Sequence, residues 1–134
     1  MKFNEHELRA KLIASNLIFM ANHHDSNEVV YVIMNFLKQY HDIYCVYLLD
    51  TIPDQGCEHY HLWINQNLDV SIEYNLDEKT IDDYSAKTLN KYDIDHIKGS
   101  RQKDLIKLVQ ELANIECAKN NNAHLTNEKK LTCR

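Results

Sequence analysis

Glycine and proline are scarce in this chain, whose 134 residues include two glycines and one proline. So little of either residue excludes collagen-like and low-complexity sequences, and no glycine-rich phosphate-binding motif is present. No stretch of about 18 apolar residues occurs, so we expect no membrane-spanning helix. With 44% hydrophobic and 26% charged residues, the composition predicts one globular domain.

Cysteine pairs in CxxC spacing are also missing, although Cys45, Cys57, Cys117 and Cys133 are present. The first residues are charged throughout and lack the apolar core of a secretory signal. We therefore expect a cytoplasmic protein with free thiols and no disulfides.

Acidic residues, in contrast, are concentrated in the middle of the chain. The net charge is −5, but residues 42–83 contain ten acidic residues against one base, Lys79. A basic stripe of Lys98, Arg101, Lys103 and Lys107 follows. Because this stripe is small beside the acidic segment, we expect no direct nucleic-acid binding.

The hydrophobic pattern predicts an α+β fold that begins with two helices. Asn4 and Glu7 have the spacing of a capping box, and a helix is expected over residues 5–21. A polar cluster over residues 22–27, which includes His23 and His24, is interpreted as a solvated loop. Ser26 or Asn27 is expected to cap a second helix that extends to about Tyr40.

Three antiparallel strands and two further helices are expected next. Residues 42–49 are apolar on both faces, as in a central strand, and residues 58–65 and 69–74 alternate. Helices are expected over residues 80–92 and from a Ser100 cap, with the domain over 1–118 and a polar tail over 119–134. If helices cover one sheet face, the other exposes His59, His61, Trp63, Asp69, Ser71 and Glu73.

One candidate site consists of Cys57, His59 and His61. Residues two apart on a strand project to the same side, so the two imidazoles could bind one zinc ion with Cys57 as a third ligand. Asp54 or a residue on the neighbouring strand could supply the fourth ligand. A small metal-binding enzyme or sensor is therefore one alternative, and exposed structural histidines explain the pattern equally well. Since no nucleophile elbow or oxyanion-forming glycine turn is present, we expect neither catalysis nor a cofactor.

A second candidate site is an acidic, aromatic-containing surface for a protein partner. Aromatic side chains provide affinity at an interface, whereas charge accelerates encounter and sets specificity. Its ten candidate residues are Glu58, Trp63, Asp69, Glu73, Tyr74, Asp77, Glu78, Asp82, Asp83 and Tyr84. The simpler interpretation is that these charges only maintain solubility.

In overall profile, the acidic segment with its interleaved Tyr and Trp residues resembles the immunity proteins of bacterial toxin systems, including those of contact-dependent growth inhibition. The resemblance covers the whole chain and includes no diagnostic motif, so no residue role is transferred. It implies an antitoxin that binds its cognate toxin, such as a nuclease domain with a basic cleft, and blocks access to substrate. A homo-oligomeric adaptor that uses its helical faces is a further alternative.

Overall fold

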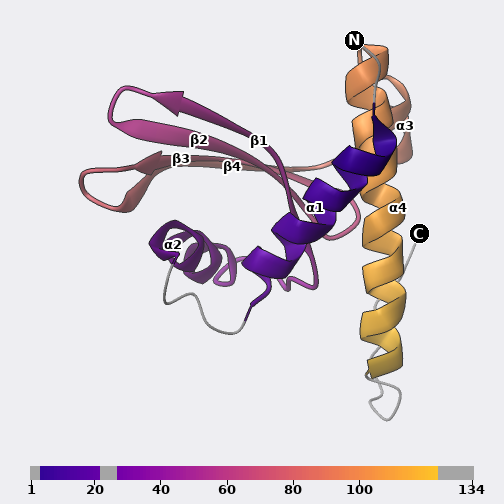
Figure 1. The fold of residues 1–134 in the computed structure, drawn as a ribbon, viewed down its shortest axis with the longest axis horizontal. Coiled ribbons are helices and arrows are strands. Elements are labelled where there is room, and N and C mark those ends of the chain that lie inside the picture. The colour runs from indigo at the N-terminus through magenta and orange to yellow at the C-terminus, as the bar shows by residue number, and fades with distance from the viewer. Residues whose placement is uncertain (1–3, 22–26, 124–134) are drawn as a thin grey trace.

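Four antiparallel strands form the centre of the fold, in the order β1-β2-β3-β4. The computed structural model describes residues 4–21 and 27–123, and therefore not residues 22–26 or most of the predicted tail. This α+β arrangement confirms the expected class and adds a strand (Figure 1). The elements are α1 (Glu5–Phe19), α2 (Glu28–Leu37), β1 (Val46–Asp54), β2 (Cys57–Ile64), β3 (Leu68–Asn75), β4 (Thr80–Thr88), α3 (Lys91–Asp95) and α4 (Ser100–Ala123).

The predicted caps of the first two helices are confirmed. The Asn4 side-chain oxygen accepts a hydrogen bond from the Glu7 N–H at 3.1 Å, and that of Asn27 accepts one from the Val30 N–H at 3.2 Å. Both satisfy a helix N–H that has no partner within the helix. The C-terminal helix α4 starts at Ser100 and continues to Ala123, beyond the expected domain end at residue 118.

The helix predicted over residues 80–92 is wrong, because most of this segment is strand β4. A bulge at Asp82 explains the misleading pattern. Side chains alternate along a strand, so Ile81 and Tyr84 would ordinarily point to opposite faces. Because Asp82 is an extra residue, Ile81 and Tyr84 point to the same face of the sheet although they are three positions apart. Apolar residues three apart are also typical of a helix, and this spacing led to the wrong prediction.

Helices cover both faces of the sheet, which corrects the expectation of a single covered face. On one face, α2 packs its apolar residues against Leu62, Val70 and Ile72. On the other, α1 and α4 cover one end of the sheet, where Tyr47 and Trp63 are register partners. The other ends of the strands project away from α4 (Figure 1). Part of this second face therefore stays uncovered.

Helix α1 also protects the free edge of β1. The side chains of Ser15 and Asn16 accept hydrogen bonds from the backbone N–H groups of Leu48, at 3.1 Å, and Val46, at 2.9 Å. Ser15 in turn donates to the carbonyl of Leu12 at 2.7 Å. An edge strand normally presents such groups to other chains, so α1 blocks edge pairing here.

A second bulge lies in β1, between Leu48 and Asp50. Leu49 is the extra residue, and it packs on the core beneath α1 and α4. Beyond it, Asp50 pairs with His61 and Ile52 pairs with His59. The bulge therefore places Asp50 and Ile52 on the same face as both histidines, where simple alternation would place them on the α2 face.

The cysteines differ in state. Cys45 is a buried free thiol and Cys57 is a partly buried free thiol, as expected. Cys117, in contrast, is disulfide-bonded, which contradicts the prediction of no disulfides. Among the described residues, no helix has both the length and the apolar content needed to cross a membrane.

Candidate functional site

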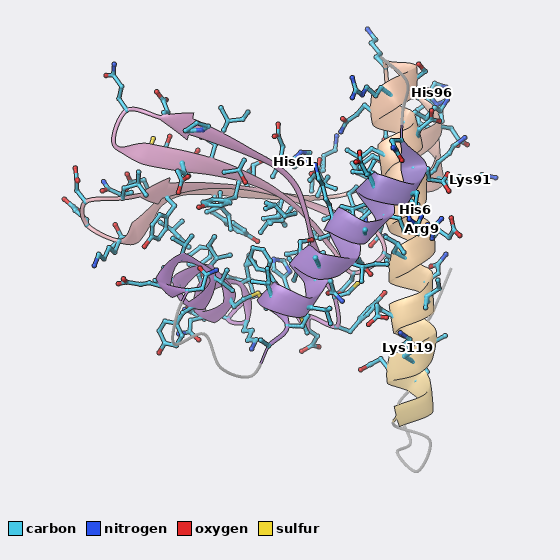
Figure 2. All side chains as sticks on the ribbon, viewed as in Figure 1. His6, Arg9, His61, Lys91, His96 and Lys119 are labelled. Carbon is cyan, nitrogen blue, oxygen red and sulfur yellow. The ribbon has the colours of Figure 1, made fainter. Side chains whose placement is uncertain are left out.

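The uncovered part of the sheet, opposite α2, forms the candidate site, which we call the open face. Figure 2 shows His61 on this side of the sheet. The register places His59 beside Glu73 and His61 beside Ser71, with Asp83 on the neighbouring strand. The open face comprises Asp50, Ile52, Asp54, Cys57, His59, His61, Asp69, Ser71, Glu73 and Asp83, and a hollow of about 350 Å³ lies within it.

Five carboxylates give the open face its charge: Asp50, Asp54, Asp69, Glu73 and Asp83. Within residues 4–21 and 27–123, none of the five forms an ion pair with lysine or arginine. Their ion-pair partners in this part of the chain are the two histidines alone. Lys87, the register partner of Asp69 on β4, is a single base against these five carboxylates, so the open face remains negative.

His61 and His59 have different surroundings, although they are neighbours on one face of β2. The Nε2 atom of His61 is hydrogen-bonded to the Oδ1 atom of Asp69. The Nε2 atom of His59 lies 3.6 Å from Asp54 Oδ2, 3.5 Å from Glu73 Oε1 and 3.8 Å from Cys57 Sγ. The structure thus brings Cys57 and His59 together as predicted, but it directs the His61 ring to another partner.

The environment of Cys57 disfavours its thiolate form. Burial raises the pKa of this thiol, and the negative charges of Glu73, Asp54 and Asp82 raise it further. A nucleophilic cysteine normally requires the opposite shift, from a positive neighbour or a helix N-terminus. The electrostatics around Cys57 therefore do not activate it for attack on a substrate.

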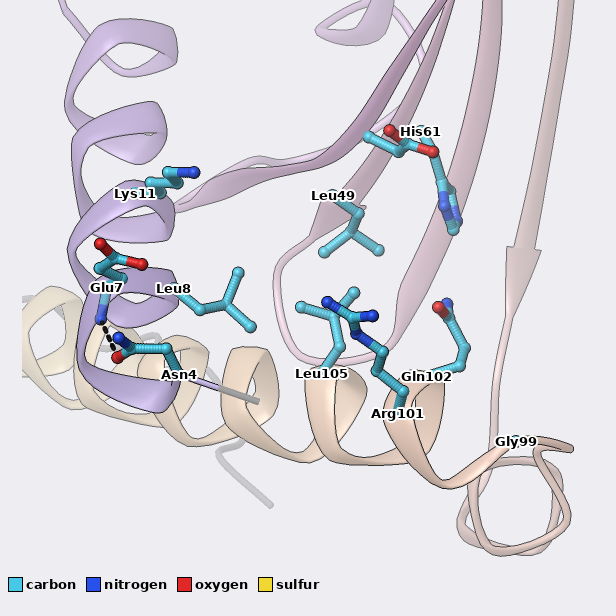
Figure 3. Close-up of a pocket in the computed structure, with 11 residues that line it drawn as sticks. Asn4, Glu7, Leu8, Lys11, Leu49, His61, Gly99, Arg101, Gln102 and Leu105 are labelled. Carbon is cyan, nitrogen blue, oxygen red and sulfur yellow. Dashed lines mark hydrogen bonds between the residues drawn. The ribbon is translucent and has the colours of Figure 1, made fainter. Parts of the chain in front are cut away.

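A larger hollow, of about 780 Å³, adjoins the open face where α1, β1 and the start of α4 meet. Figure 3 shows Lys11 and Arg101 directed toward this space from the two helices. Asp50 and His61 line both hollows, so the two are neighbours. At the helical end the lining includes Lys11, Arg101 and the carboxylate of Glu7, whereas Asp50 lines the hollow from the sheet.

The ten residues predicted for a partner surface are divided among several places. Asp69, Glu73 and Asp83 lie on the open face, whereas Glu58 and Tyr84 lie on the α2 side. The turn between β3 and β4 contains Asp77 and Glu78, and Asp82 occupies the bulge.

The structure contradicts the predicted exposure of two aromatic residues. Trp63 is 0% exposed because α1 and α4 cover its end of the sheet, and Tyr74 is 2% exposed on the face that α2 covers. Tyr84 is engaged within the protein, 4.9 Å from Phe36 between ring centres and 2.5 Å from His41 Nε2 through its hydroxyl. These aromatic rings therefore stabilise the fold and leave little surface for a partner.

Sequence reasoning missed two residues of the open face, Asp50 and Ile52, and named Asp54 only as one possible fourth zinc ligand. Their orientation depends on the bulge at Leu49, for which the apolar run around it gives no signal. Ile52 is 56% exposed and stands among the polar groups as an apolar contact point.

Comparisons with known proteins give no match to a family model, to a curated protein or to a solved structure.

Proposed function

We propose that this protein is an inhibitor that binds a basic protein partner through its open face. The observation that carries the proposal is the concentration of five carboxylates on the open face. None of them forms an ion pair with lysine or arginine among the described residues, and Lys87 is the single base beside them in the sheet. Such a field attracts a positively charged surface and accelerates association with it.

The scaffold suits a preformed binding surface. The carboxylates project from paired strands, with α2 packed against the opposite face of the sheet. Side chains held on a rigid sheet lose less freedom on binding than those on a mobile loop, so more of the interaction energy becomes affinity. Ile52 offers an exposed apolar contact within this charged surface.

The class of partner follows from the resemblance in profile to immunity proteins. The proposed partner is a toxin domain in the same cytoplasm, such as a nuclease whose active-site cleft is basic. Occupying that cleft with the open face would exclude the nucleic-acid substrate, whose phosphates need the same positive groups. No catalysis by this chain is required.

A comparison of two charge variants tests the proposal. The open-face variant contains Asp50→Asn, Glu73→Gln and Asp83→Asn. The matched control contains Asp77→Asn, Glu78→Gln and Asp82→Asn, which remove the same charge from the β3–β4 hairpin end of the originally predicted surface. Each protein, and the wild type, is used as bait in extract of its native cells across a range of salt concentrations.

We expect the wild type and the control to capture the same basic protein, and the open-face variant to lose it. The captured protein is then purified, and the chain should inhibit its activity at a one-to-one ratio. Capture that is unaffected by the open-face substitutions, or a partner whose activity is not inhibited, would contradict the proposal. Circular dichroism of all three proteins checks that the substitutions leave the fold intact.

A further inference from the structure

At the end of the β1–β2 hairpin, the side chains of Asp54, Cys57 and Glu73 converge on the Nε2 atom of His59. Asp54 and Cys57 are register partners across the hairpin turn, and His59 follows on the same face. Their ligand atoms all lie within 4.8 Å of one another. Glu73 reaches the same His59 nitrogen from the adjacent strand β3, so two carboxylates and a thiol surround it.

Hydrogen bonding does not account for this convergence. A ring nitrogen has either one N–H or one lone pair, so Nε2 of His59 can make one good hydrogen bond. Both carboxylate oxygens lie at 3.5–3.6 Å from it, beyond the roughly 2.7–3.2 Å of a nitrogen–oxygen hydrogen bond. Two of these groups are left without a hydrogen bond from the nitrogen they surround.

The same distances fit a tetrahedral metal centre. With Zn–N and Zn–O distances of about 2.0–2.2 Å and Zn–S of about 2.3 Å, the edges between ligand atoms are about 3.3–3.6 Å. The three measured separations from His59 Nε2 are 3.5, 3.6 and 3.8 Å. Small side-chain movements would bring Asp54, Cys57 and His59, whose ligand atoms lie within 4.8 Å of one another, around an ion. Glu73 lies outside that set and would have to move toward Asp54 and Cys57 to become the fourth ligand.

We propose that Asp54, Cys57, His59 and Glu73 form a binding site for Zn²⁺. Sulfur, nitrogen and oxygen ligands together favour zinc over magnesium or calcium, which take oxygen ligands. Cys57 binds as the thiolate, so its proton passes to solvent when the ion enters. The site concerns the isolated chain and does not depend on the proposed partner.

His61 is not a ligand of this site, which revises the cluster that the sequence suggested. Its Nε2 atom is hydrogen-bonded to Asp69, and Asp69 is the register partner of Trp63, six residues along β2 from Cys57. His61 can therefore serve as the control for His59. Both residues lie on the same face of β2, but only His59 approaches the thiol of Cys57 among the described contacts.

Metal titration of the purified chain tests the site. The protein is freed of metal with a chelator and titrated with Zn²⁺ by calorimetry and with Co²⁺ by absorption spectroscopy. Cobalt bound to a thiolate in a tetrahedral site gives a sulfur-to-cobalt charge-transfer band and intense visible bands. The variants are Cys57→Ser, His59→Gln and Glu73→Gln, with His61→Gln as the control.

We expect one Zn²⁺ per chain, with unchanged affinity in His61→Gln. Loss of His59 should weaken binding by more than the ~10–100-fold typical of losing an outer-shell partner, and Cys57→Ser should abolish the charge-transfer band. Absence of stoichiometric binding, an equal loss in His61→Gln, or a persistent band in Cys57→Ser would overturn the proposal.

A measurement on the unmutated protein covers the case in which a variant fails to fold. Cys57 is a partly buried free thiol that an alkylating reagent can reach. Bound zinc should slow its alkylation at least tenfold, read by mass spectrometry of the peptide that contains Cys57. An alkylation rate that is the same with and without zinc would show that the thiol is not a ligand.

Discussion

Asn16 of α1 accepts a hydrogen bond from the backbone N–H of Val46, the first residue of β1, at 2.9 Å. Both residues are buried, so neither group has water as an alternative partner. This one side chain thus satisfies an N–H of the edge strand and attaches the helix to the sheet.

Replacing Asn16 with alanine should destabilise the protein by ~1–3 kcal/mol, because the buried Val46 N–H loses its acceptor. Urea unfolding gives the free energy. Asn35→Ala, at an exposed position of α2, is the control and should change stability by less than about 0.5 kcal/mol. Equal effects at the two sites would show that the hydrogen bond to Val46 contributes nothing.

Trp63 is the only tryptophan, so its fluorescence reports its surroundings directly. Because the side chain is fully buried, we expect blue-shifted emission and little quenching by iodide until the protein unfolds. Trp63→Ala should cost ~3–5 kcal/mol by leaving a cavity under α1 and α4. Strong quenching of the native protein would instead support the exposed position first expected for this residue.

Alkaline pH should destabilise the protein. Burial raises the pKa of the Cys45 thiol from 9.0 to about 12, so between these values the unfolded chain releases a proton that the folded chain retains. Stability from this group is complete below pH 9 and falls by up to about 1.4 kcal/mol per pH unit above it.

Burial also raises the pKa values of Tyr44, Tyr47 and Tyr60, which steepens the decline above pH 10. Urea unfolding at pH 8, 9, 10 and 11 measures it, and Cys45→Ala should show a shallower slope between pH 9 and 10. A flat profile over pH 8–11 would contradict burial of these groups.

Zinc should stabilise the folded chain if it binds as proposed. At a free concentration one hundred times the dissociation constant, binding to the native state alone adds about 2.7 kcal/mol. Thermal unfolding with and without zinc should show this gain in the wild type and in His61→Gln. His59→Gln, tested at the same zinc concentration, should show almost none; a similar gain in all three proteins would place the ion elsewhere.

Local patterns predicted the first half of the fold well. Asn4 and Asn27 cap α1 and α2 as their sequence positions indicate, because capping depends on residues within one turn. Alternation likewise located β2 and β3. The apolar character of both faces around Val46 and Tyr47 matches their cover on two sides. The predicted central strand over residues 42–49 is wrong, because β1 spans Val46–Asp54 and is an edge strand whose free edge α1 covers.

Long-range packing was not predictable from the same patterns. Trp63 alternates with Leu62 and Ile64, and nothing local shows that α4 returns to cover its face. The bulges at Leu49 and Asp82 each change the face of every later side chain in their strand, and neither residue type marks a bulge. The candidate site was therefore found in part: its histidines and Asp54 were named, whereas Asp50 and Ile52 were missed.

The bulge at Leu49 adds a core side chain to β1 without taking a place in the pairing with β2. Deleting Leu49 would make β1 a regular strand and would leave Asp50 opposite His61 and Ile52 opposite His59. The core beneath α1 and α4 would lose the Leu49 side chain, whereas the open face would keep Asp50, Ile52 and Asp54. This deletion should therefore lower stability and leave the partner surface and the proposed zinc site in place.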